Sequence, residues 1–135
     1  MILSEAVRTL LDQPLIGRLS VIDFEGYPHT IPIWFARDGD EVVFFSSRNT
    51  RKITYIQGNT NGALTIGGDP YGSEGYLLKG EFAIEDDVGY HWLREITYRY
   101  EPREVAEKDL AEWIAGWASK DLVILRFTPR RVVKV

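Results

Sequence analysis

Three cations stand close together in a stretch that contains no acidic residue. They fall within five positions of the acid-free segment 42–68: Arg48, Arg51 and Lys52. Ser46 and Ser47 directly precede them at the end of an apolar run. Serine hydroxyls, the amides of a helix N-terminus and the charges of arginine and lysine together favour binding of an anion such as phosphate. A solvated surface turn would show the same residues, because charged runs are usually exposed, so both interpretations stay open.

A second candidate is the segment 29–36, whose residues alternate between the two faces of a predicted strand. The alternation places Ile31, Ile33 and Phe35 on one face and Thr30, Pro32 and Trp34 on the other. Because proline has no amide hydrogen, Pro32 predicts an edge or an interruption of the strand. Exposed backbone groups beside Trp34 could hold a planar heterocycle. Alternatively, Trp34 is the outer aromatic of an edge strand that packs on a helix or on another subunit.

Composition excludes several other kinds of site. The chain has 135 residues, no cysteine and two histidines, His29 and His91. These counts exclude disulfides and thiolate sites and argue against a multi-histidine metal site, so we predict no bound metal. A net charge of −4 argues against a nucleic-acid partner. No Ser-His-Asp order and no Gly-x-Ser-x-Gly motif is present, and the catalytic residues stay unassigned.

Hydrophobic patterning predicts the elements that position these residues. We expect helices over about 4–12, 50–58, 92–100 and 110–117, and six strands over 15–24, 29–36, 42–47, 63–66, 75–84 and 122–127. Gly80 predicts a bulge or a close backbone approach, and Pro129 is expected to separate the last strand from the tail. Hairpin-linked strands followed by late helices indicate an antiparallel barrel decorated with helices. No linker is visible, so residues 1–135 are expected to form a single domain.

Several stretches resemble the pyridoxamine 5′-phosphate oxidase-related family of flavin-binding split barrels. They are residues 25–35, 44–47, 50–52, 75–83, 96–100 and 123–129, and the similarity spans almost the whole chain. The resemblance implies a mainly β, α+β fold: a six-stranded antiparallel split β-barrel. It also implies a homodimer with flavin mononucleotide (FMN) sites between the subunits. In that arrangement the phosphate is held by Arg51 and Lys52 with Ser46 and Ser47, and the isoalloxazine ring is lined by Thr30, Ile31, Pro32, Ile33 and Trp34.

The resemblance implies an FMN-dependent oxidoreductase-like protein that acts on a small-molecule substrate, with a reduced nicotinamide as one candidate donor. One alternative is a deazaflavin-dependent reductase of the same fold. Others are a module that binds flavin or haem without turnover, and an empty barrel used for protein association. Haem is disfavoured because His29 is the only candidate ligand near the cleft. Residues 130–135 lack the basic substrate motif of true pyridoxamine phosphate oxidases, so oxidation of vitamin B6 is not expected.

The start of the chain is not expected to act as a targeting signal. The first eight residues lack the basic-then-apolar order of a signal peptide. The apolar runs are also far shorter than the roughly 20 residues that span a bilayer. We therefore expect a cytoplasmic protein with no membrane partner.

Overall fold

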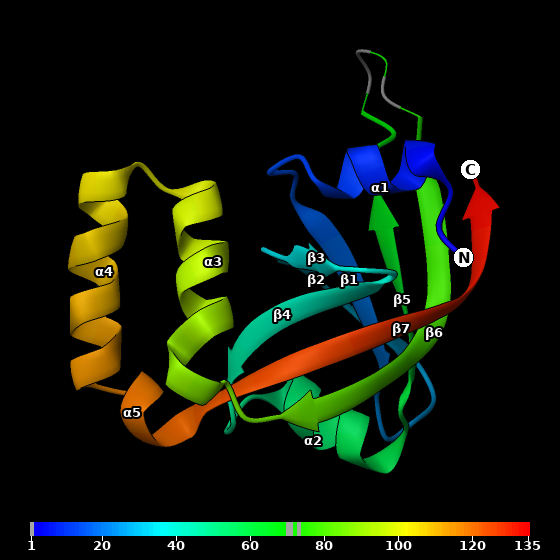
Figure 1. The fold of residues 1–135 in the computed structure, drawn as a ribbon. Coiled ribbons are helices and arrows are strands. Elements are labelled where there is room, and N and C mark those ends of the chain that lie inside the picture. Colours follow the sequence, from blue (N-terminus) through cyan, green and yellow to red (C-terminus); the bar gives the residue numbers. More distant parts are fainter. Residues whose placement is uncertain (1, 70–71, 73) are drawn as a thin grey trace.

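A seven-stranded antiparallel sheet forms the body of the molecule (Figure 1). The computed structural model describes residues 2–69, 72 and 74–135. The strands follow the order β2-β1-β5-β6-β7-β4-β3, so β2 and β3 form the two edges of an open, split barrel. The strands are β1 (Gly17–Ile22), β2 (Pro28–Ile33), β3 (Ala36–Asp38), β4 (Glu41–Ser47), β5 (Asn61–Ile66), β6 (Tyr76–Glu85) and β7 (Leu122–Lys134).

The helices lie at the ends and at one side of this sheet (Figure 1). They are α1 (Glu5–Leu11), α2 (Arg51–Gly58), α3 (His91–Tyr100), α4 (Arg103–Ala115) and α5 (Ala118–Asp121), with a 3₁₀ turn over Val88–Tyr90. The segment between β6 and β7 holds α3, α4 and α5, which stand together beside the barrel. The predicted α+β split barrel is therefore confirmed. Within the part of the chain that the structure describes, no helix is long and apolar enough to cross a membrane.

The strand expected over residues 29–36 is divided in two, which explains the seventh strand. β2 ends at Ile33 and β3 begins at Ala36, with Trp34 and Phe35 between them. The side chain of Phe35 is fully buried at 0% exposure. Its amide donates to the hydroxyl of Tyr100 at 3.2 Å rather than to a neighbouring strand. The interruption that Pro32 predicted is present, two residues further along the chain.

The expectation that Pro129 ends the last strand is wrong. β7 continues through it to Lys134. Pro129 lies opposite Gly80, where the register of β6 and β7 shifts between Lys79 and Gly80. A proline is tolerated there because a bulge does not require its missing amide hydrogen. The bulge predicted at Gly80 is confirmed.

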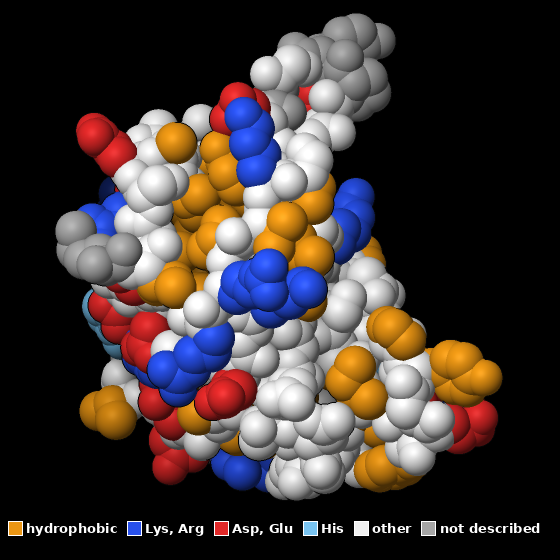
Figure 2. All heavy atoms as spheres, turned by 90° about the vertical axis from the view of Figure 1, so that its right-hand side faces the viewer, with side chains coloured by type: hydrophobic (Ala, Val, Ile, Leu, Met, Phe, Trp, Pro, Cys, Tyr) orange, Lys and Arg blue, Asp and Glu red, His pale blue; other side chains and the backbone are white. Residues whose placement is uncertain are grey.

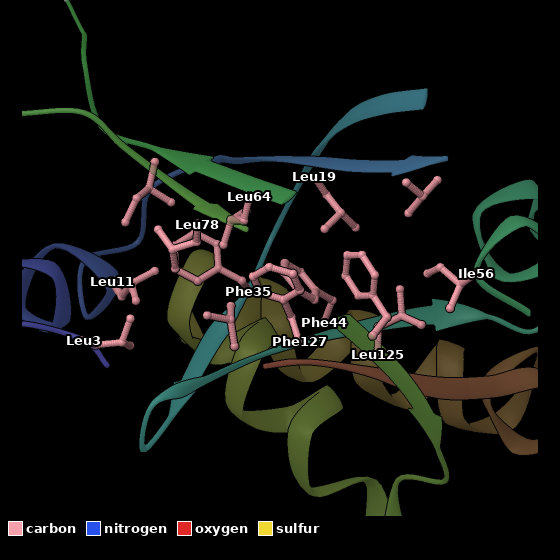
Figure 3. Packing of buried hydrophobic residues seen from close by; sticks show 14 of the residues in the cluster. Leu3, Leu11, Leu19, Phe35, Phe44, Ile56, Leu64, Leu78, Leu125 and Phe127 are labelled. Atoms are coloured by element: carbon pink, nitrogen blue, oxygen red, sulfur yellow. The ribbon is translucent and has the colours of Figure 1, made fainter. Parts of the chain in front are cut away.

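The core fills the inside of the barrel, and a helix closes each end of it (Figure 3). Phe35, Phe44 and Phe127 are each fully buried at its centre. Leu11 enters from α1 at one end, and Ile56 enters from α2 at the other. Burial of aromatic and branched side chains of this size is the main source of stability in such a fold.

An ion pair fastens the end of α1 to β3, and it makes stability depend on pH. Two guanidinium nitrogens of Arg37 donate to the carboxylate of Asp12, both at 2.8 Å. This side-chain hydrogen bonding lowers the pKa of Asp12 below its ordinary value of 3.8. Because the folded pKa is the lower one, the stabilisation is complete above pH 3.8 and is lost as pH falls through the folded value.

We therefore expect Arg37→Gln to flatten the acid side of the stability profile. The wild type should lose free energy of unfolding steadily below about pH 4, and the variant should lose less. The difference should stay below about 1 kcal/mol because the pair is partly exposed. Urea unfolding between pH 2.5 and 7 measures it. Parallel profiles for the two proteins would contradict the role given to this pair.

Candidate functional site

A pocket of about 350 Å³ lies where β2 ends, beside β4 and α2. It is lined by Ile16, Ile31, Pro32, Ile33, Trp34, Phe45 and Lys52. Four consecutive residues from Ile31 onward contribute, although successive side chains of a strand point to opposite faces. The pocket therefore meets the strand edge-on. The structure brings Lys52 together with most of the segment that the sequence predicted for the ring.

The free edge of β2 exposes mainly hydrogen-bond acceptors. The carbonyl of Arg18 accepts from the hydroxyl of Thr65 on β5 at 3.5 Å. A side chain on Gly62, also on β5, would lie 2.6 Å from the carbonyl of Ser20. The carbonyls of these two β1 residues therefore face β5, away from β2. In an antiparallel pair, the residues opposite them must direct their own backbone groups away from β1 as well.

The residues opposite Arg18, Ser20 and Ile22 on β2 are Pro32, Thr30 and Pro28. Their carbonyls face outward along the free edge, but the two prolines have no amide hydrogen. Thr30 is therefore the only donor among these three residues. A hydroxyl contact of 2.8 Å between Ser20 and Thr30 agrees with the close side-chain approach of such a pair. The side chain of Thr30 does not line the pocket, although its backbone belongs to this edge.

Lys52 is the one cation in an otherwise apolar lining. Its side chain is half-buried, and burial lowers the pKa of its ammonium group. Among the residues that the structure describes, none forms an ion pair with it. A desolvated cation without a partner is costly, and an anion bound in this pocket would offset that cost.

The start of α2 adds further anion-binding groups. Thr50 is the residue before the helix, but its side chain caps no helix amide; its hydroxyl donates to the carbonyl of Ser47 at 3.2 Å. The first amides of α2 therefore stay available for another acceptor. Arg51, the first residue of the helix, is exposed and does not line the pocket. Its charge nevertheless stands beside these amides.

The two predicted serines mainly hold the turn between β4 and α2. The Ser46 side chain is buried, and its hydroxyl donates to the carbonyl of Ser47 at 3.0 Å. Neither serine lines the pocket, so a role for them in binding phosphate stays a prediction. Arg48 points elsewhere: its amide donates to the carbonyl of Asp121 at 2.6 Å, and its guanidinium lies 3.6 Å from Asp86.

The helical segment between β6 and β7, called the helical insertion below, packs against both aromatic residues of the pocket lining. The ring of Trp34 is parallel to that of Tyr100 on α3, with centroids 5.0 Å apart. Phe45 packs against Trp113 at 6.0 Å and Trp117 at 6.5 Å. Ile16 and Phe45 were missed by sequence reasoning, since apolar residues in or beside a strand look like ordinary core.

His29 lies away from the lining. Its ring contacts Tyr55 on α2, with centroids 5.5 Å apart, and it is not among the residues around the pocket. The geometry therefore gives no support to the haem alternative.

Comparison with known proteins identifies a family over nearly the whole chain. The family model described as pyridoxamine 5′-phosphate oxidase matches residues 3–135. A search of curated proteins finds no match.

Solved structures share the fold at low sequence identity. An F420 reductase is 23% identical, with a TM-score of 0.75, and the match covers 97% of this chain and 98% of the other. General Stress Protein 26 from Bacillus anthracis str. Sterne is 19% identical, with a TM-score of 0.73 and coverage of 100% and 95%. An FAD-binding protein from Mesorhizobium loti is 22% identical, with a TM-score of 0.64 and coverage of 96% and 92%. At these identities the likeness establishes the fold.

Proposed function

Because this chain belongs to the pyridoxamine 5′-phosphate oxidase family, we propose that its pocket binds FMN and that the protein is a flavin-dependent oxidoreductase. The observation that carries the proposal is Lys52, a half-buried cation in an apolar pocket beside a free strand edge, with no ion-pair partner in the part of the chain that the structure describes. That combination suits a ligand with a flat apolar ring system at one end and an anionic group at the other. Residues 1–135 would then act as one flavin-binding domain.

Each part of the cofactor has a complementary group on the protein. Arg51, Lys52 and the first amides of α2 would hold the phosphate. The ring would lie against Trp34 and Phe45. The imide N–H of the isoalloxazine would find an acceptor among the carbonyls of the β2 edge. FMN when bound supplies the redox chemistry, while these residues bind it, orient it and exclude water from one side of the ring.

A deazaflavin coenzyme is the second candidate, and the β2 edge supports it. A flavin ring nitrogen that accepts a hydrogen bond is replaced in a deazaflavin by a C–H group. Pro32 contributes no backbone donor, so at this residue the edge offers no hydrogen bond to that nitrogen, and a C–H group would be accepted equally well there. The F420 reductase that shares the fold fits the same proposal. The substrate would be a small molecule, with a reduced nicotinamide as a candidate donor.

We also propose a homodimer, in which a second copy covers the outer face of the sheet. Figure 2 shows hydrophobic side chains gathered between Lys and Arg side chains on the side of β5, β6 and the end of β7. A broad pocket of about 550 Å³ lies on the sheet, lined in part by Ile22, Ala63 and Leu77. Apolar patches rimmed by charge are typical of protein interfaces. Light scattering after size exclusion tests the dimer, and a monomer would contradict it.

The cofactor proposal predicts a coloured protein. The visible absorption spectrum of the purified chain, with mass measurement of the ligand released by denaturation, is expected to show FMN. If the protein is isolated empty, titration with FMN and with F420 should restore the spectrum of the bound form. Release or tighter binding of F420 would replace FMN by the second candidate. A chain that binds neither would overturn the proposal.

A further inference from the structure

One hydroxyl group from the helical insertion joins the two backbone segments that flank the pocket. The hydroxyl of Tyr100 donates to the carbonyl of Leu15 at 2.6 Å and accepts from the amide of Phe35 at 3.2 Å. Leu15 directly precedes Ile16, and Phe35 directly follows Trp34. Ile16 and Trp34 line the pocket, whereas Tyr100 does not.

The ring of Tyr100 reinforces the same contact. It lies parallel to the ring of Trp34, with an interplanar angle of 5°, and meets Phe35 edge-on at 6.3 Å. Burial raises the pKa of the Tyr100 hydroxyl, so the group stays a protonated donor at neutral pH. Trp34 and Phe35 lie in the gap between β2 and β3, where no regular strand pairing fixes the backbone. Tyr100 therefore replaces the missing ladder contacts at this point.

The preceding residue anchors the end of α3 in the same region. The guanidinium of Arg99 donates to the carbonyls of Leu11 and Gln13 and lies over the ring of Phe35, 5.4 Å from its centroid. Tyr98, two residues before Tyr100 on α3, is exposed instead, at 42%. The attachment to the pocket is thus made by the last turn of the helix.

We propose that Tyr100 is a positioning residue: it holds the segments that carry Ile16 and Trp34 at a fixed separation, so that the helical insertion sets the width of the pocket. Tyr100 acts through these two residues and does not touch the ligand. The part of the test that uses FMN rests on the proposed function. A second part needs no ligand.

Tyr100→Phe removes the hydroxyl and keeps the ring, and Tyr98→Phe makes the same chemical change on the exposed side of the same helix. The dissociation constant for FMN is expected to rise about fivefold to tenfold in Tyr100→Phe, since the loss of a typical hydrogen bond is worth up to such a factor. It should stay within about twofold in Tyr98→Phe. Equal affinities for the two variants would overturn the proposal.

The second part of the test needs no ligand and monitors the surroundings of Trp34 directly. With 5-fluorotryptophan incorporated, the chain gives four ¹⁹F resonances, one for each tryptophan, and Trp34→Phe assigns the one of interest. Tyr100→Phe should shift or broaden that resonance in the absence of FMN, whereas Tyr98→Phe should leave it in place. An unmoved resonance would overturn the proposal, even in a protein that binds no FMN. Failure of the wild type to bind FMN would count against the proposed function alone.

A measurement on the wild type covers the case in which Tyr100→Phe does not fold. If the hydroxyl contact and ligand binding are coupled, the coupling is reciprocal. FMN should therefore slow hydrogen exchange at the amide of Phe35. The amide of Leu93, which donates to Asp87 at 2.9 Å and lies outside the pocket, serves as the control. Equal exchange of the Phe35 amide with and without FMN would overturn the proposal.

Discussion

Replacing Arg51 and Lys52 together by alanine is expected to leave a folded protein that no longer binds FMN. Neither cation forms an ion pair with a residue that the structure describes, so the fold loses little when they are removed. Hydrogen bonds to charged groups are worth about 1.5–3 kcal/mol each. Loss of both should therefore raise the dissociation constant by about a hundredfold or more. Titration of the stripped protein with FMN, followed by visible absorbance, measures the change.

The matched control removes the same two charges elsewhere. Arg103 and Lys108 are exposed residues of α4, and their double alanine variant should bind FMN within about twofold of the wild type. Between the single variants, Lys52→Ala should be the weaker binder, since Lys52 lines the pocket and Arg51 does not. A double variant of Arg51 and Lys52 that retains a full complement of flavin would refute the phosphate assignment.

Replacing Gly80 by alanine should cost about 3 kcal/mol of stability or more, because the added carbon meets backbone. A Cβ at this position would lie 2.1 Å from the carbonyl oxygen of Thr128 and 2.9 Å from its carbonyl carbon. These atoms belong to β7, and moving them disturbs the pairing of β6 and β7 on both sides of the bulge. Urea unfolding measures the loss. Low yield of soluble protein would be a coarser sign of the same defect.

Gly58→Ala is the control for that substitution. Gly58 is the last residue of α2, and a Cβ there would lie 3.6 Å from the ring of Phe24, an ordinary contact. The variant should match the wild type or exceed its stability by up to about 1 kcal/mol, because alanine favours the helix. If the two glycine variants are equally stable, the close approach of backbone at Gly80 does not constrain the fold.

The sequence predicted local features well where one residue type limits the backbone by itself. Gly80 indicated a bulge, and Pro32 indicated an interrupted strand, since both residues restrict pairing in a known way. Pro129 was misjudged for the complementary reason. A proline ends a strand only when its amide is needed, and the bulge opposite it removes that need. The identity of the opposing residue is set by the register of two distant segments, which a local pattern does not contain.

In the candidate site, too, some residues could be predicted from the local sequence and others could not. Ile31 to Trp34 and Lys52 were predicted, and they do line one pocket. Phe45 was not, because a phenylalanine in an apolar strand is typical of core; in the structure it is half-buried beside the pocket and packs against Trp113 and Trp117. A role for Ser46 in binding phosphate stays a prediction; in the structure its hydroxyl bonds to nearby backbone, as short hydroxyl side chains often do. The backbone acceptor is the carbonyl of Ser47.

The two prolines of β2 also bear on how this protein behaves at high concentration. An unpaired strand edge is a template for aggregation, because another molecule can add a strand to it. Pro28 and Pro32 leave Thr30 as the only donor among the three residues whose backbone faces outward, so an incoming strand would find too few partners. The gap in the barrel can thus stay open to a small molecule while it resists intermolecular β-pairing.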